Sequence, residues 1–443
     1  MGEKCYIKQF NWLQKLKVWV DPEFFKSIIG RSAKIVSINI TGAFLLFISN
    51  YLLVRFFGEE VYGDYVIINI WVNFFSVVCL FGMDDYFVAT LPKFSFSTEN
   101  KKQVSSVLLW SFKVFLTAFV LCVLGVGFFS KKHLFKDVIA ENLFLFFIIL
   151  CELTLVLLLT HFLRGVNKIE IGQWIEKTVR PGVFVLLITV LFSSGALLSL
   201  KSILWAQAGT LCVVLVVLFV IVRPLYEKPR FPVSFDRSCK SNFTFLCISL
   251  LYLLSTRLDI MYLTKHVISP EVGYYNIAAR FSDLIAYPLT AFNLIVPTFL
   301  SREFHANPQK VAGIIKKLTI ISLIVIGLSL VVAFSLGKTV LSFFGNNFIK
   351  SFWPFMLLSG GHLFAACGAP WNAFLMISGN QRFSLMCLVI NVLTVFVLCN
   401  SLIPVYGSIG AAASVLGGGF VNLIALLYFG RKCMMNVVYN KPR

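Results

Sequence analysis

The sequence predicts an all-α polytopic membrane protein with about twelve transmembrane helices in two parallel six-helix lobes, and its composition and apolar runs carry this prediction. Of its 443 residues, 58% are hydrophobic and only 13% are charged, whereas soluble domains carry about 25% charged residues. The apolar residues form long runs, and about 18 such residues suffice to cross the roughly 30 Å of bilayer hydrocarbon. A chain so poor in charge must expose its outer surface to lipid.

Candidate spans follow one another along the whole chain. They lie near residues 33–57, 64–82, 104–129, 142–160, 180–198, 202–222, 242–263, 281–300, 318–336, 352–378, 383–403 and 408–429. Ahead of them, Trp12, Leu16 and Trp19 share one face at helical spacing, which is typical of a helix in the membrane interface. The predicted parts are a cytoplasmic amphipathic segment at 1–32, a six-helix lobe at 33–222, a cytoplasmic connector at 223–241, a second six-helix lobe at 242–430 and a cytoplasmic tail at 431–443.

The connector near the midpoint divides the spans into six and six. It contains three prolines between Pro224 and Pro232, together with several basic residues. Because six is even, both halves enter the membrane from the same side, as parallel repeats do. The stretches 60–65 and 271–275 each contain Glu-Val followed by Gly-x-Tyr, next to the second helix of a half. This repeated motif favours an origin of the two halves by duplication.

The net charge of +19 indicates membrane topology and not a nucleic-acid partner. With spans alternating from a cytoplasmic N-terminus, the cytoplasmic segments hold 28 Lys and Arg residues and the outer loops hold 8. This asymmetry follows the positive-inside rule and predicts that both termini lie in the cytosol. Because the basic residues flank spans and do not form one surface, we expect no nucleic-acid binding.

Neither metal binding nor catalysis is indicated. Eight of the 11 cysteines fall inside predicted spans, where they serve as small apolar residues. The other cysteines lie on segments predicted to be cytoplasmic, where thiols stay reduced. The five histidines lack ligand spacing, no CxxC pair is present and no catalytic constellation is recognisable. We therefore expect no cofactor, no metal and no enzymatic activity.

Polar residues inside the spans are unevenly distributed. Ionisable groups are costly in hydrocarbon, so they usually face a cavity or a partner. Most lie on spans one, two, seven and eight or at their ends: Asn39, Asn50, Arg55, Asn69, Asn73, Asp84, Asp85, Arg257, Asp259, Arg280, Asp283 and Asn293. The main exceptions are Lys113, Glu152, His362, Asn391 and Asn422. We expect the first two helices of each half to line the space between the halves.

Four basic residues are candidates for binding an anion in that space. Arg257 is the best candidate, because the carboxylate two residues further on lies about 200° around the helix and cannot pair with it. A structural ion pair with another helix remains the alternative for Arg257. Arg280 and Asp283 are three residues apart and can neutralise each other. Arg55 and Lys113 lie near span ends, where extension of the side chain to the lipid headgroups is the alternative.

Three acidic residues, Asp259, Asp283 and Glu152, are candidates for carrying coupling protons. Because Arg257 cannot reach it, Asp259 needs a partner on another helix or in a ligand. A structural pair or a helix cap is the other interpretation for each of the three.

Two stretches of the sequence carry a family resemblance. The first, Leu45 to Tyr65, combines a hydrophobic helix, Arg55, a glycine, an acidic pair and a Gly-Asp-Tyr sequence. The second comprises Arg257-Leu-Asp259, Glu271-Val-Gly-Tyr-Tyr275, Ala278-Ala-Arg280 and Asp283. These features resemble bacterial lipid-linked O-antigen (Wzx-type) flippases of the multidrug/oligosaccharidyl-lipid/polysaccharide exporter superfamily. The likeness in layout covers about residues 30–430.

The resemblance implies a V-shaped pair of six-helix lobes that works by alternating access. It implies an undecaprenyl pyrophosphate substrate carrying one oligosaccharide repeat unit, flipped from the cytoplasmic to the periplasmic leaflet of a bacterial inner membrane. Other polysaccharide-assembly proteins become candidate partners. Arg257, Arg55, Arg280 and Lys113 would then contact the pyrophosphate, since arginine binds phosphate oxygens through paired hydrogen bonds.

Two alternative functions remain open. A multidrug or cation antiporter of the same superfamily needs a cavity dominated by acidic residues, whereas this sequence offers both signs with cations prominent. A membrane enzyme, such as a polysaccharide polymerase, generally needs a sizeable outer loop or a catalytic His/Asp set, and the sequence has neither.

Overall fold

Every regular element in the described part of the chain is helical, as the apolar runs predicted. The computed structural model describes residues 22–93, 98–130, 136–195, 199–227, 235–289, 296–297, 300–301, 304 and 311–439. Eight of its helices are long and apolar enough to cross a membrane, and two of these are double-length helices with a break inside. With the arms of each broken helix counted separately, and with the shorter helices Arg180–Ser193 and Ser269–Ile285 added, the described residues account for twelve crossings. Trp12, Leu16 and Trp19 lie outside the described residues.

The first lobe is built around a long helix that reverses direction. It comprises α2 (Pro22–Leu80), α3 (Met83–Thr90), η1 (Leu91–Lys93), α4 (Thr98–Ser130), α5 (Asp137–Glu141), α6 (Leu143–Gly165), α7 (Ile169–Trp174), the π-helical turn η2 (Ile175–Val179), α8 (Arg180–Ser193), α9 (Leu200–Val222) and η3 (Arg223–Leu225). Gly58 breaks α2 with φ +84° and ψ 171°, a conformation that glycine adopts without steric cost. We call residues 22–57 α2a and residues 59–80 α2b.

The second lobe ends in a similar broken helix. It comprises α10 (Phe235–His266), α11 (Ser269–Ile285), α13 (Val311–Ser342), η5 (Asn346–Ser351), α14 (Phe352–Ile377) and α15 (Gln381–Tyr439). Gly407, with φ +55° and ψ −129°, breaks α15 three residues after Pro404. The positive φ again requires glycine, and the break yields crossings eleven and twelve.

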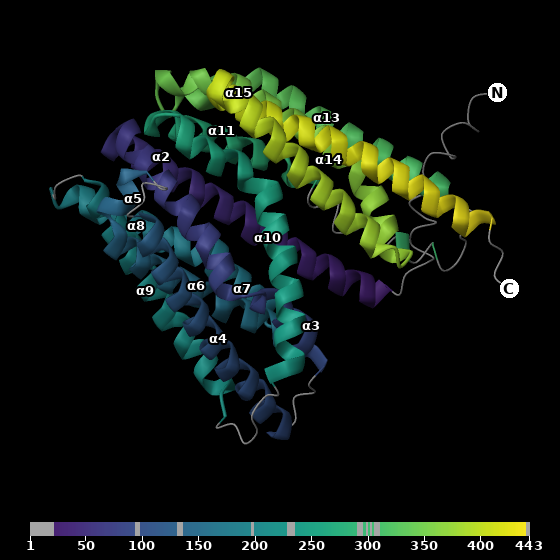
Figure 1. Ribbon diagram of the computed structural model, residues 1–443, viewed down its shortest axis with the longest axis horizontal. Coiled ribbons are helices and arrows are strands. Elements are labelled where there is room, and N and C mark those ends of the chain that lie inside the picture. The colour runs from purple at the N-terminus through teal and green to yellow at the C-terminus, as the bar shows by residue number, and fades with distance from the viewer. Residues whose placement is uncertain are drawn as a thin grey trace.

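The two lobes form a V, meeting at one end and diverging toward the other, with α10 lying between them (Figure 1). The end where they meet holds the Gly58 break, because Glu59 bonds to Tyr274 and Asn347 of the second lobe there. The Gly407 break lies beside Glu271 in the same region. We call this end the apex. The V shape that the family resemblance implied is therefore confirmed.

Two crossings begin earlier than the sequence predicted. Helix α11 starts at Ser269, twelve residues before the predicted span 281–300, and Pro270 occupies its first turn, where proline is favoured. The fifth crossing is also longer, because α7, η2 and α8 follow one another without interruption from Ile169. The first turns of α11 and of the stretch from α7 to α8 carry polar residues that face protein rather than lipid. Hydropathy alone therefore places the start of each of these two spans too late.

Candidate functional site: a basic cavity between the lobes

A cavity of about 370 Å³ lies between the lobes. Both arms of α2, together with α10 and α11, contribute to its wall, which confirms the prediction that these helices face one another. Helices α6, α8 and α9 and the turn η2 complete the wall on the first lobe. A substrate in this cavity would contact both lobes at once, which alternating access requires.

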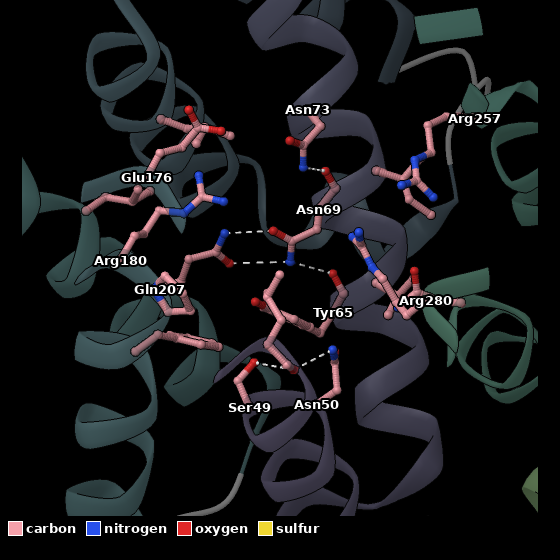
Figure 2. Close-up of a pocket in the computed structure, with 18 of the residues that line it drawn as sticks. Ser49, Asn50, Tyr65, Asn69, Asn73, Glu176, Arg180, Gln207, Arg257 and Arg280 are labelled. Atoms are coloured by element: carbon pink, nitrogen blue, oxygen red, sulfur yellow. Dashed lines mark hydrogen bonds between the residues drawn. The ribbon is translucent and has the colours of Figure 1, made fainter. Parts of the chain in front are cut away.

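Side-chain amides form the middle of the cavity wall (Figure 2). Gln207 of α9 donates from Nε2 to Asn69 Oδ1 at 2.7 Å, and Asn69 Nδ2 in turn donates to Gln207 Oε1 at 3.4 Å. Asn69 and Asn73 also donate to the carbonyl oxygens four residues earlier, at 2.9 and 2.7 Å. The rings of Tyr65 and Phe184 stack nearby with centroids 6.0 Å apart. Fixed amides beside aromatic rings suit a polar, hydroxyl-rich ligand.

A second hydrogen-bonded chain joins the lobes at the cavity edge. Asn276 Nδ2 of α11 donates to the hydroxyl of Tyr62 at 2.9 Å, and that hydroxyl donates to Asn50 Oδ1 of α2a at 3.0 Å. Tyr62 is fully buried and Asn276 is 8% exposed. Because buried polar groups are costly when unpaired, this chain holds α2a, α2b and α11 in one arrangement.

Replacing Tyr62 with phenylalanine should lower the stability of the protein by about 1–3 kcal/mol, because the buried amide of Asn276 and the partly buried amide of Asn50 then lose their shared partner. Thermal unfolding of the purified protein in detergent measures the effect. Tyr252→Phe is the matched control, because Tyr252 is 65% exposed. Equal melting temperatures for the two variants would contradict the assigned role of the chain.

The second lobe places two arginines on the cavity wall, and they differ in their partners. Arg257 Nη2 of α10 lies 3.3 Å from Asp283 Oδ2 of α11, and both side chains are partly exposed. Asp283 is therefore the structural ion-pair partner of Arg257, which is the alternative that the sequence left open. Arg280 lines the same cavity, and no carboxylate of the described residues lies within ion-pair distance of it. Arg280 and Asp283, which the sequence allowed to neutralise each other, are not within ion-pair distance, since Asp283 turns to Arg257.

Asp259 faces away from Arg257, as its helical spacing predicted. It is 5% exposed and accepts a hydrogen bond from the hydroxyl of Tyr275, which is fully buried on α11. Asp259 is not among the residues lining the cavity. This contact is the partner on another helix that the sequence required.

The first lobe adds charged residues that the sequence reasoning missed. Lys177 and Arg180 line the cavity together with Glu176, and all three come from the η2–α8 junction. Glu176 lies 2.5 Å from Arg164 Nη2 and 2.9 Å from Lys177 Nζ. Figure 2 shows Arg180 on the wall opposite Arg257 and Arg280, with the amides between them. The i, i+4 spacing of Glu176 and Arg180 ahead of the apolar run could have indicated that these charged residues belong to a helix.

Besides Asp259 and Asp283, three more predicted site residues lie outside the cavity. Arg55 is exposed on α2a, and it lies five residues, or about 140°, from the cavity residue Asn50. Lys113 is exposed on α4, which contributes no residue to the wall. Glu152 of α6 is half-buried and is absent from the wall, although its neighbour Leu153 belongs to it. Its Oε2 has no hydrogen-bond partner among the described residues. Helical rotation, which hydropathy does not report, separates these residues from the cavity.

The cavity wall therefore carries a surplus of positive charge. Four cations line it, and the only carboxylate among its described lining residues is Glu176. That carboxylate is held by Arg164 and Lys177. Arg180 and Arg280, on opposite lobes, have no carboxylate of the described residues within ion-pair distance. Such a site favours an anionic ligand over a cationic one.

Solved structures similar to this chain are membrane transporters. One is described as the inward-facing conformation of a multidrug resistance MATE family transporter of the MOP superfamily; it has a TM-score of 0.73 and 12% identity, over 93% of this chain and 100% of that one. The lipid II flippase MurJ, in an inward closed conformation, has a TM-score of 0.72 and 16% identity, over 91% of this chain and 89% of that one. No curated sequence is significantly similar to this chain.

A third similar structure differs in its described pocket. It is a MOP superfamily transporter from Pyrococcus furiosus, described as having a binding pocket of reverse polarity that suggests a different function. Its TM-score is 0.65 and its identity is 12%, over 92% of this chain and 95% of that one. At these identities the likeness concerns the fold, and one fold can host different substrates.

The two lobes, which form a V around a central polar cavity, have the fold of the MOP superfamily transporters described above. A sequence profile for the family described as "Polysaccharide biosynthesis protein" matches residues 32–301, more than half of the chain. The chain belongs to this polysaccharide biosynthesis family.

Proposed function

We propose that the protein flips a lipid-linked oligosaccharide, carried on undecaprenyl pyrophosphate, from the cytoplasmic to the outer leaflet of a bacterial inner membrane. O-antigen or a similar polysaccharide would be built from the exported repeat units. The lipid chain remains in the bilayer, while the cavity carries the pyrophosphate and the sugars. The polysaccharide biosynthesis family supports the saccharide part of this proposal, and the lipid II flippase of the same fold supports the lipid part.

The observation that carries the proposal is the cationic cavity between the lobes. Arg180 and Arg280 face it from opposite sides without carboxylate partners in the described chain. Arginine binds phosphate through paired, charge-assisted hydrogen bonds, and the amides of Asn69 and Gln207 suit sugar hydroxyl groups. A cavity of this charge is unfavourable for cationic drugs, which makes the multidrug antiporter the weaker candidate.

The charge distribution in the sequence suggests the direction of transport. The excess of basic residues on one side supports an orientation in which the open end of the V, away from the apex, faces the cytosol. A membrane potential that is negative inside favours outward movement of an anion by about 2.3 kcal/mol per charge per 100 mV. Substrate entering from the cytosol would therefore move outward down its electrical gradient.

Deletion of the gene in its host should test the proposal directly. We expect one complete repeat unit, linked to the polyprenyl pyrophosphate, to accumulate on the cytoplasmic side while surface polysaccharide disappears. The composition of that intermediate would identify the sugar. Normal surface polysaccharide in the deletion strain, with a loss of drug resistance instead, would contradict the proposal and favour the antiporter.

A further inference from the structure

The lobes are joined at the apex by hydrogen bonds that lie outside the cavity wall. The Glu59 carboxylate, directly after the Gly58 break, accepts from the hydroxyl of Tyr274 on α11 and from Asn347 Nδ2 of η5 at 3.1 Å. On the same face, Lys136 Nζ donates to the carbonyl oxygen of Val267 at 2.8 Å. Each of these contacts runs from the first lobe to the second.

The environment of Lys136 shows that this contact is partly shielded from water. Burial lowers the pKa of its ammonium group, and the nearby Asp64 carboxylate opposes that shift. The contact places a cation beside the carbonyl oxygen that follows α10, where a helix end carries partial negative charge. It therefore reinforces the bonds of Glu59 at the same lobe contact.

Aromatic rings from both lobes also pack against one another beside the cavity. Phe47 and Tyr51 of α2a meet Phe344 of the second lobe edge to face, with centroids 5.3 and 5.8 Å apart. Phe281 of α11 packs on the same rings, 5.6 Å from Phe47. These ring contacts add apolar packing between the lobes to the polar contacts at the apex.

The backbones of α2b and α11 also approach each other closely near the Glu59 contact. A Cβ atom placed on Gly63 would lie 1.9 Å from the carbonyl oxygen of Ser269, and one placed on Gly273 would lie 3.5 Å from Gly63 Cα. Gly63 and Gly273 occupy equivalent positions in the Gly-x-Tyr motif that is repeated in the two halves. The equivalent helices α2b and α11 thus cross each other at their glycines, with the ring of Tyr62 packed against Gly273.

The acidic residues beside these glycines have different roles in the two halves. Glu271 Oε1 accepts from the backbone N–H of Ser408 at 3.1 Å, within the second lobe and directly after the Gly407 break. Glu59 bonds instead across the lobes. Glu60, its exposed neighbour, makes no such contact in the described chain. Among the described residues, Glu59 of the first half therefore links the lobes at the apex, whereas Glu271 of the second half does not.

We infer that Glu59 is the latch of the outer gate: its bonds to Tyr274 and Asn347 keep the apex closed, and their rupture lets the lobes part around the Gly63–Gly273 crossing. This inference rests on the proposed transport cycle and on the proposed orientation, in which the apex faces outward. Because the latch lies outside the cavity wall, its loss changes the balance between closed and open states and leaves the substrate contacts in place.

Access to the cavity from outside tests the latch. The native cysteines are removed, and Asn73→Cys is introduced as a reporter in the cavity. Spheroplasts containing this protein are treated with a charged, membrane-impermeant thiol reagent, and the rate of labelling at the reporter is measured. Adding Glu59→Ala should speed labelling about tenfold, because breaking a charge-assisted hydrogen bond shifts a two-state equilibrium by about that factor. Adding Glu60→Ala removes the same charge one residue away and should leave the rate unchanged. Equal labelling rates in these two variants would overturn the inference.

One further variant and one comparison with export distinguish loss of the latch from failed insertion and from a wrong proposed function. Asn347→Leu removes one donor and keeps the carboxylate, so it should give an intermediate rate even where Glu59→Ala fails to insert; a rate equal to that of Glu60→Ala would count against the latch. Labelling does not depend on the identity of the substrate. If the variants label as expected while the parent protein, which lacks the reporter, supports no polysaccharide export, the proposed function is refuted and the latch still stands.

Discussion

Replacing Arg280 with alanine should abolish export of the lipid-linked saccharide while the protein still inserts at its normal level. Arg280 lines the cavity and has no carboxylate of the described residues within ion-pair distance. Its charge is therefore available to a ligand. Loss of a charge-assisted hydrogen bond costs about 1.5–3 kcal/mol, which corresponds to a decrease in affinity of about ten- to a hundredfold. Complementation of a deletion strain, read as surface polysaccharide, measures the effect.

Matched variants distinguish this role from a general need for positive charge. Arg280→Lys keeps the charge but loses the paired geometry, so partial export is expected. Arg257→Ala should also reduce export, and by less, because Asp283 already neutralises Arg257. Arg55→Ala and Lys113→Ala should export normally, since neither residue lines the cavity. Loss of export in the last two variants with normal export by Arg280→Ala would contradict the assigned site.

Gly63→Ala should destabilise the closed protein, although the same substitution usually strengthens a helix. Within a helix, alanine is favoured over glycine by roughly 0.5–1 kcal/mol. At Gly63 the new Cβ would lie 1.9 Å from the Ser269 carbonyl oxygen, and backbone on both sides leaves no flexible group to yield. Overpacking of this kind costs about 1–3 kcal/mol. Thermal unfolding should show a lower melting temperature.

Gly125→Ala in α4 provides the control for Gly63→Ala. A Cβ at Gly125 meets no atom within 4 Å, so this variant should be as stable as the parent protein or slightly more stable. With Gly63→Ala, the cavity reporter should also become more accessible from outside, because the close crossing at the apex can no longer form. A melting temperature of Gly63→Ala at or above that of Gly125→Ala would show that the approach of the two helices is not tight.

The sequence predicted the number of crossings and the polar helices because both follow from one-dimensional patterns. Apolar runs separated by breaks at Gly58 and Gly407 were recognisable as separate spans, even where the structure joins them into one helix. The clustering of Asn50, Asn69 and Arg257 on particular spans indicated which helices face each other. Composition and order along the chain suffice for such conclusions.

The candidate site was only partly predictable because it depends on rotation and on helix starts. Arg55 was favoured for its charge, yet its helical position turns it away from the cavity. Arg180 is the first residue of the predicted span 180–198 and was not recognised as a site residue; the continuous helical stretch that carries it begins at Ile169. The contact between Glu59 and Asn347, 288 residues apart in sequence, arises only when the lobes meet. No local pattern contains that information.

Translocation by the purified protein in proteoliposomes tests the central claim most directly. The measurement follows a polyprenyl-pyrophosphate-linked oligosaccharide, isolated from the deletion strain, from one leaflet to the other under an imposed membrane potential. We expect translocation by the parent protein and by Arg55→Ala, and none by Arg280→Ala. Failure of the parent protein to move this lipid, together with exchange of cationic drugs for protons or sodium ions, would contradict the account.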